Sequence, residues 1–196
     1  MTNVRLAELS AITRRSGQTI QNMSNARELP WPSDEFEGSG HRRFNGRHAL
    51  ALIVLEMLTK FGARMGDASD TVRGSWRMIE RFTDDIEAGR DPGARFVASL
   101  TIAENHSVLG PRVSGVMIAH TGTADELIPA LRYEMDSAGK ESDRGNGVTL
   151  RHLGVASFIT ANLSEAYRLL SIRAASLGFE VRGPAIIRMT DQGADE

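Results

Sequence analysis

The chain contains, at residues 45–62, the stretch NGRHALALIVLEMLTKFG, which is far more apolar than the sequence around it. Asn45 is a residue that favours the start of a helix, and Gly62 favours the position just after a helix end. The stretch therefore predicts a helix that runs to Phe61. Because this helix is apolar on nearly all sides, other elements must cover it on more than one side.

The segments before this helix are shorter and more polar. Apolar residues at helical spacing predict a short helix over residues 6–12, followed by a polar turn at 13–17. A second short helix is predicted over 18–26, with Ser16 as its N-cap, and its outer face is nearly all amide and hydroxyl. Prolines and glycines at 29–40 exclude a helix there and indicate a loop or a small β-hairpin.

The second half of the chain mixes strand and helix patterns. The sequence predicts a helix at 69–88, strands at 95–104 and 113–120 that could pair, a helix at 124–137, a strand within 148–160, a helix from Asn162 or Ser164 to Leu177, and one or two last strands in 179–189. The predicted fold class is therefore α+β. We expect domain boundaries that separate residues 1–70, a linking helix at 71–90, and an α+β domain at 93–196.

The composition is ordinary for a soluble globular protein: of 196 residues, 41% are hydrophobic and 24% are charged. No stretch approaches the roughly 18 consecutive apolar residues of a membrane span, and Arg5, Glu8, Arg14 and Arg15 lie where a signal peptide would be apolar. The sequence thus predicts a cytoplasmic protein without a membrane partner. The chain has no cysteine, which excludes disulfides, thiolate metal sites, iron–sulfur clusters and cysteine nucleophiles.

Positive charge is unevenly distributed along the chain. The net charge is −2, but residues 1–80 hold 11 Arg and Lys against 9 Asp and Glu, whereas residues 81–196 hold 12 against 16. Only Lys60 and Lys140 are lysines, so guanidinium groups carry nearly all the positive charge. A planar, multi-donor guanidinium suits phosphate contacts, although arginine-rich codon usage explains the bias equally well.

The order of the N-terminal elements resembles the winged helix-turn-helix of MerR-type proteins. That family has, in fixed register, a Glu-Leu-Ala opening, a Thr-Ile-Arg or Thr-Leu-Arg stretch in the recognition helix, Leu-Leu-Pro after it, Arg-Arg-Tyr at the wing, and a helix that ends in Leu-Gly-Phe-Ser-Leu. The residues in that register, within about 6–68, are Glu8-Leu9-Ser10, Thr19-Ile20-Gln21, Leu29-Pro30, Arg42-Arg43-Phe44, Leu52, Leu55, Leu58 and Phe61-Gly62, with Met65 at the later Leu position.

The resemblance implies that the helix at 18–26 enters the major groove of double-stranded DNA and that the wing contacts the DNA backbone. The residue types agree with this, because Gln and Asn amides make paired hydrogen bonds to adenine edges and Arg binds guanine or phosphate. Taken one at a time, each side chain could equally be solvated surface. The expected DNA-binding residues are Arg14, Arg15, Ser16, Gln18, Thr19, Gln21, Asn22, Arg42, Arg43 and Arg47.

The sequence departs from the family pattern in the turn and the recognition helix. The family's Gly-Val is Arg14-Arg15 here, its recognition-helix arginine is Gln21, and its aromatic pair is Asn22-Met23. Because a buried valine cannot simply become arginine, either the turn is rebuilt or Arg15 points to solvent. These changes raise the polar and basic content of the surface that would face DNA.

One apolar stripe follows the predicted winged domain. Trp76, Ile79, Phe82 and Ile86 recur at helical spacing. The stripe resembles the coiled-coil dimerisation helix of MerR-type regulators, which makes these four the expected dimerisation residues of a homodimer. Packing onto the chain's own C-terminal domain is an equally plausible alternative.

Motifs that would indicate catalysis are weak. His106 and His120 lie near Glu104, but the five histidines lack the spacing of metal ligands, and Gly145-Asn146-Gly147 lacks the Lys-Ser/Thr of a phosphate-binding loop. The sequence therefore predicts no enzyme, no catalytic residue, no metal site and no cofactor.

These observations favour a sequence-specific DNA-binding transcriptional regulator that is associated with the nucleoid and resembles MerR-type proteins. A small-molecule or protein effector at residues 93–196 stays open, while the lack of cysteine argues against the metal-sensing branch. The alternative is a phage-type or architectural DNA-binding factor, such as an excisionase-like or packaging protein, that uses the same winged domain. A third interpretation, an α+β enzyme with an N-terminal targeting module, has the least support because few polar residues converge.

Overall fold

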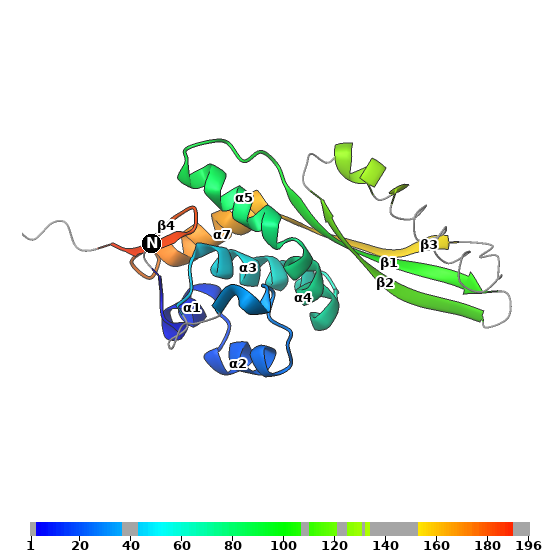
Figure 1. Cartoon of the computed structure of the whole chain (residues 1–196), viewed down its shortest axis with the longest axis horizontal. Helices are drawn as coiled ribbons and strands as arrows, with labels where there is room; N and C mark the ends of the chain where they lie inside the picture. Colours follow the sequence, from blue (N-terminus) through cyan, green and yellow to red (C-terminus); the bar gives the residue numbers. More distant parts are fainter. Residues whose placement is uncertain are drawn as a thin grey trace, which may run out of the picture.

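The computed structural model describes residues 3–36, 43–106, 110–120, 125–130, 132–133 and 153–189. It has an α+β fold in which most helices belong to the N-terminal half and the strands belong to the C-terminal half (Figure 1). The elements are α1 (Leu6–Thr13), α2 (Gly17–Asn25), the short 3-10 helix η1 (Ser33–Phe36), α3 (Gly46–Lys60), α4 (Met65–Gly74), α5 (Trp76–Glu87), β1 (Phe96–His106), β2 (Gly110–His120), β3 (Leu153–Asn162), α7 (Leu163–Ala175), β4 (Phe179–Arg182) and β5 (Ala185–Arg188).

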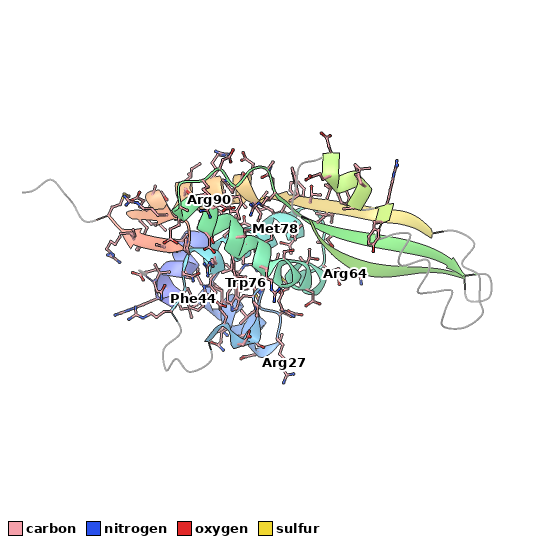
Figure 2. All side chains as sticks on the ribbon, turned by 45° about the horizontal axis from the view of Figure 1, so that its top comes forward. Arg27, Phe44, Arg64, Trp76, Met78 and Arg90 are labelled. Atoms are coloured by element: carbon pink, nitrogen blue, oxygen red, sulfur yellow. The ribbon has the colours of Figure 1, made fainter. Side chains whose placement is uncertain are left out.

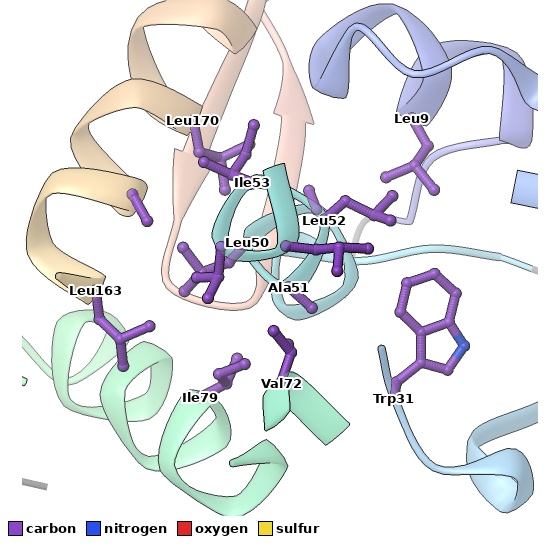
Figure 3. Close-up of a cluster of buried hydrophobic side chains, with 14 of the residues drawn as sticks. Leu9, Trp31, Leu50, Ala51, Leu52, Ile53, Val72, Ile79, Leu163 and Leu170 are labelled. Atoms are coloured by element: carbon purple, nitrogen blue, oxygen red, sulfur yellow. The ribbon is translucent and has the colours of Figure 1, made fainter. Parts of the chain in front are cut away.

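Helix α3 lies at the centre of the hydrophobic core, as its sequence predicts. The Asn45 side chain accepts hydrogen bonds from the backbone N–H groups of Arg47 and His48, and the chain turns away at Gly62 with φ 102°. Residues 48–55 are all buried. Figure 3 shows α3 with buried side chains of α1, α4, α5 and α7 around it, so the helix is covered on several sides.

The first two helices form a helix-turn-helix at the expected place. Helix α1 ends at Thr13, the turn Arg14–Ser16 follows, and the Ser16 hydroxyl accepts a hydrogen bond from the N–H of Thr19 at 3.0 Å to cap α2. Further along, Val4 and Phe44 form an isolated antiparallel bridge with backbone N···O distances of 2.7 and 3.0 Å. This bridge ties the start of the chain to the residues just before α3.

The single helix predicted at 69–88 is wrong, because the structure has two helices there. Helix α4 already begins at Met65, and the chain breaks at Ser75 before α5 begins at Trp76. The break follows Gly74, a poor helix former, and the Ser75 hydroxyl donates to the Thr71 carbonyl at 2.8 Å, which satisfies a carbonyl at the end of α4.

The strands predicted at 95–104 and 113–120 are confirmed as a pair. Strands β1, β2 and β3 form an antiparallel sheet in the order β2-β1-β3, which extends to one side of the helices (Figure 1). The helix predicted at 124–137 agrees with helical residues 125–130 and 132–133, and its remainder lies outside the described residues. The chain enters β1 beside the point where it leaves β3, and there the N–H of Leu163 donates to the Arg95 carbonyl at 2.8 Å.

The C-terminal elements return to the N-terminal helices. Helix α7 packs against α3, and the hairpin β4–β5 brings Ile186 into the same core. The turn of this hairpin lies at the start of α3, where the Gly46 N–H donates to the Pro184 carbonyl at 2.7 Å. One continuous core thus includes residues from both ends of the chain, and the division at residues 70 and 93 stays a prediction. None of the described helices is long and apolar enough to cross a membrane.

Candidate nucleic-acid interface

The exposed face of α2 carries a row of amide side chains. Gln18, Gln21, Asn22 and Asn25 are all exposed. Gln18 donates its amide N–H to Asn22 Oδ1 at 2.9 Å, and Gln21 donates to Asn25 Oδ1 at 3.1 Å. The row, which we call the amide face, holds amide groups in place through i, i+4 hydrogen bonds while other donors and acceptors stay available to a ligand.

The opposite side of α2 anchors the helix to the protein. Ile20 and Met23 are buried, and Thr19 and Ser16 bond to each other and to the first turn of the helix. The predicted DNA-binding residues Ser16 and Thr19 are therefore occupied in capping α2. Their role in the structure is to fix where the helix begins and, with it, the direction of the amide face.

The turn before α2 places its two arginines differently. Arg14 is exposed and has φ 54°, a left-handed conformation that favours glycine. Arg15 is half-buried, and its Nη1 lies 3.9 Å from the sulfur of Met23. Arg15 therefore does not simply point to solvent: its guanidinium lies against the side chain of Met23, and burial lowers its pKa.

The loop before α3 is anchored by an aromatic cluster. Phe44 and Trp31 lie edge to face at a centroid distance of 6.1 Å, and His48 packs against Trp31 at 4.9 Å and against Trp76 at 5.5 Å. Burial and the nearby Arg47 lower the pKa of His48 to about 3, so this histidine is neutral at physiological pH. Arg43 is exposed next to this anchor, and Arg42 lies outside the described residues.

Arg47 does not belong to this surface. Its Nη2 donates to Asp84 Oδ1 at 2.6 Å, its Nε donates to Thr83 at 3.3 Å, and Glu80 lies at 3.8 Å. These bonds tie α3 to α5 within the chain. The structure therefore does not support the phosphate contact that the sequence predicted for Arg47, because carboxylates already neutralise its charge.

Arginines without a described carboxylate partner occur around α2 and also elsewhere, as at Arg64, Arg77 and Arg81. Arg73, Arg90, Arg168, Arg182 and others form ion pairs with aspartate or glutamate. Among the described residues, no carboxylate lies within ion-pair distance of four arginines that are in the turn before α2, directly after α2 or directly before Phe44, although the charge of Glu56 acts on Arg15. These four, which we call the flanking arginines, are Arg14, Arg15, Arg27 and Arg43.

The sequence-based prediction did not include two residues of this surface, Arg27 and Asn25. Arg27 follows α2 with φ 59°, and Figure 2 shows its side chain at the edge of the molecule below the helices. Its position directly after a polar helix was the available signal. Asn25 was detectable by its spacing of four residues from Gln21.

The residues of the predicted dimerisation stripe pack against their own chain. Trp76, Ile79 and Phe82 are at most 5% exposed and pack in the core, and Ile86 lies partly buried beside it. The intrachain packing that the sequence left as the alternative is what the structure contains. A dimer through this stripe would require the helix to leave its own core, so any dimer surface must be sought elsewhere.

Other chemistry has little support in the described part of the chain. No group of three or more His, Asp or Glu side chains there could hold a metal ion. A pocket of about 540 Å³ lies beside the end of α2, lined by Ser24, Arg27, Leu29, Trp31, Pro32, Ser33 and Arg73. Its lining combines Arg27 and two hydroxyls with apolar side chains, while Arg73 is already paired with Asp70 at 2.9 Å.

Compared with known proteins, the chain matches no protein-family model and no curated protein.

Proposed function

We propose that this protein is a sequence-specific DNA-binding transcriptional regulator whose helix α2 enters the major groove. The observation that carries the proposal is the amide face together with its flanking arginines. Helix α2 has no acidic residue, and no described carboxylate forms an ion pair with the flanking arginines, although the charge of Glu56 acts on Arg15. Such a surface suits a ligand that offers both hydrogen-bonding edges and negative charge.

The chemistry favours double-stranded DNA over other anions. A major groove about 12 Å wide accepts one α-helix, and its base edges offer the paired donors and acceptors that Gln and Asn amides match. Phosphates lie on both sides of the groove, where the flanking arginines would neutralise them. In this arrangement the amides supply sequence preference and the arginines supply affinity.

Backbone geometry supports the resemblance to MerR-type proteins. The family has glycine at the position of Arg14, and this residue has the positive φ that glycine adopts most easily. The Val4–Phe44 bridge lies where the base of a wing is expected. Both features are properties of the backbone, so they are independent of the side chains on which the resemblance is based.

The test is selection from a genomic DNA fragment library by the purified protein at two salt concentrations, with sequencing of the retained fragments. We expect enrichment of a short sequence that survives the higher salt, and an inverted repeat would indicate a homodimer. Enrichment at one promoter spacer favours regulation, whereas enrichment at attachment or packaging sites favours an architectural role. No enrichment at either salt would contradict the proposal.

A further inference from the structure

A buried arginine of α7 contacts the end of α1, where the helix-turn-helix begins its turn. The Arg173 side chain is only 7% exposed. Its Nη1 donates to Glu56 Oε2 at 2.7 Å, and its Nη2 donates to Glu56 Oε1 at 3.0 Å. Nη1 also donates to the Thr13 carbonyl at 3.4 Å, directly before the turn Arg14–Ser16.

The bonds join three helices that are far apart in the sequence. Arg173 lies on α7, Glu56 on α3, and Thr13 at the end of α1. Glu56 is also held by Lys60 at 2.7 Å, so its carboxylate cannot easily turn away. The guanidinium therefore fixes the last carbonyl of α1 relative to the central helix.

The cost of this arrangement argues for a role beyond stability. A charged pair that is removed from water gains little net free energy, and well-packed apolar residues are often as stable in its place. Among the described residues, Arg173 Nε is buried without a hydrogen-bond partner, which adds a further cost. What the pair provides in return is a defined geometry at the turn.

The same C-terminal segment also holds the other end of the surface. The Pro184 carbonyl accepts the hydrogen bond from the Gly46 N–H, close after Phe44 and Arg43. In addition, Arg188 of β5 pairs with Glu8 of α1 at 2.8 Å. Residues 163–188 thus contact α1 at Glu8 and at its last residue, Thr13, and contact Gly46 shortly after Phe44.

We propose that α7 is part of the DNA-binding unit and that Arg173 is the positioning residue that fixes the turn Arg14–Ser16 and, through it, the direction of the amide face. This inference rests on the proposed function and adds the element that keeps its surface in place. Arg173 touches no DNA in this account. It acts through Glu56 and the Thr13 carbonyl.

The chain offers a matched control for this test. Arg95 is also a partly buried arginine, which donates to Asp85 Oδ2 at 2.8 Å, and Asp85 keeps Arg90 as a second partner. Arg173→Met leaves Glu56 with Lys60, just as Arg95→Met leaves Asp85 with Arg90. Both variants lose one partly buried ion pair, but only the first loses a contact to the end of α1, directly before the turn.

The experiment measures two quantities for the full chain and both variants, well below their unfolding temperatures. One is the ratio of affinities for a selected DNA fragment and for a scrambled fragment. The other is amide hydrogen exchange at Arg14 and Arg15, whose N–H groups donate to the Ala11 and Ser10 carbonyls. We expect Arg173→Met to lower the affinity ratio several-fold and to speed this exchange, while Arg95→Met changes neither.

A second variant, Glu56→Gln, keeps the side-chain size and should give a smaller effect in the same direction. If Arg173→Met keeps the wild-type affinity ratio, or loses no more than Arg95→Met, the inference is overturned and the proposed function stands. If the wild-type protein prefers no DNA at all, the proposed function is overturned and this inference with it.

Discussion

Arginine has several different roles in this protein, and the neighbours of each arginine decide which one it has. Arg173 and Arg47 are bonded to carboxylates inside the chain, whereas Arg14 and Arg43 are exposed with no described carboxylate partner. The sequence alone could not separate these cases, because Arg47 meets Asp84 across 37 positions. Local motifs predicted the amide residues of α2 correctly as exposed, since their helical spacing is contained in the helix itself.

Replacing Arg43 with alanine should weaken binding to all DNA alike. If the guanidinium contacts one phosphate, the slope of log affinity against log salt should become smaller by about 0.9. Fluorescence anisotropy at four salt concentrations measures this slope. Arg168→Ala, which removes an exposed arginine from α7, should leave it unchanged, and an unchanged slope for Arg43→Ala would remove the wing from the interface.

Arg47→Ala should show the opposite behaviour. The loss of its bonds to Asp84 and Thr83 should lower the free energy of unfolding by about 1 kcal/mol, because the pair is only partly shielded from water. The salt dependence of DNA binding should stay as in the wild type. Chemical denaturation and the anisotropy titration test this together, and a smaller salt slope would restore Arg47 to the DNA contacts.

At the scale of elements, the central helix was predictable and the helices around it were less so. The apolar run and its caps define α3 within the local sequence. The break between α4 and α5 was missed because Val72 and Trp76 keep the helical spacing of apolar residues across it, and only Gly74 and the Ser75 hydroxyl mark the end of α4. Spacing of apolar residues therefore indicates which side is buried and does not indicate where a helix stops.

Alanine at Gly46 and alanine at Gly74 should change the free energy of unfolding by different amounts, because Gly46 is in close contact with the β4–β5 turn and Gly74 faces open space. A Cβ on Gly46 would lie 2.6 Å from the Gly183 carbonyl oxygen, so Gly46→Ala must displace the β4–β5 turn. We expect a loss of about 1 to 3 kcal/mol in the free energy of unfolding. Gly74→Ala meets nothing within 4 Å and should be neutral or slightly stabilising. Equal effects in thermal unfolding would argue against the docking of the hairpin on α3.

At the scale of the whole molecule, the chain folds back so that its C-terminal residues complete the N-terminal core. Leu170 and Ile186 pack in the same core as Leu9 and Leu52. No sequence pattern indicated this packing of the C-terminal residues. The contacting residues are more than a hundred positions apart, and an apolar side chain does not specify which other apolar side chain it will contact. The α+β class was predictable from the patterns, but this return of the chain was not.

The buried His48 should make the stability of the molecule depend on pH. Its pKa is about 3 in the folded protein and near 6.5 in the unfolded chain, so only the unfolded state takes up the proton between these values. Stability should therefore fall as the pH decreases from 6.5 towards 3. Between pH 7 and 5 this one group contributes a loss of roughly 1 to 2 kcal/mol.

The variant His48→Gln removes the titrating group. Denaturant midpoints at pH 7 and pH 5 should then differ less than in the wild type, even if the variant is less stable at both. A wild type whose stability does not change between these two pH values would show that His48 takes up its proton in the folded protein as well. The burial of His48 in the aromatic cluster would then not keep the imidazole neutral.

The central claim is that the amide face of α2 recognises bases. The most direct test compares the affinities of Gln21→Ala and Asn22→Ala for two DNA fragments. Each variant is titrated against a selected fragment and against a scrambled fragment of equal length, and circular dichroism confirms that the helices remain. We predict that each variant loses about 1 to 3 kcal/mol of preference for the selected fragment, with nearly unchanged affinity for the scrambled one. Equal losses on both fragments would contradict the account.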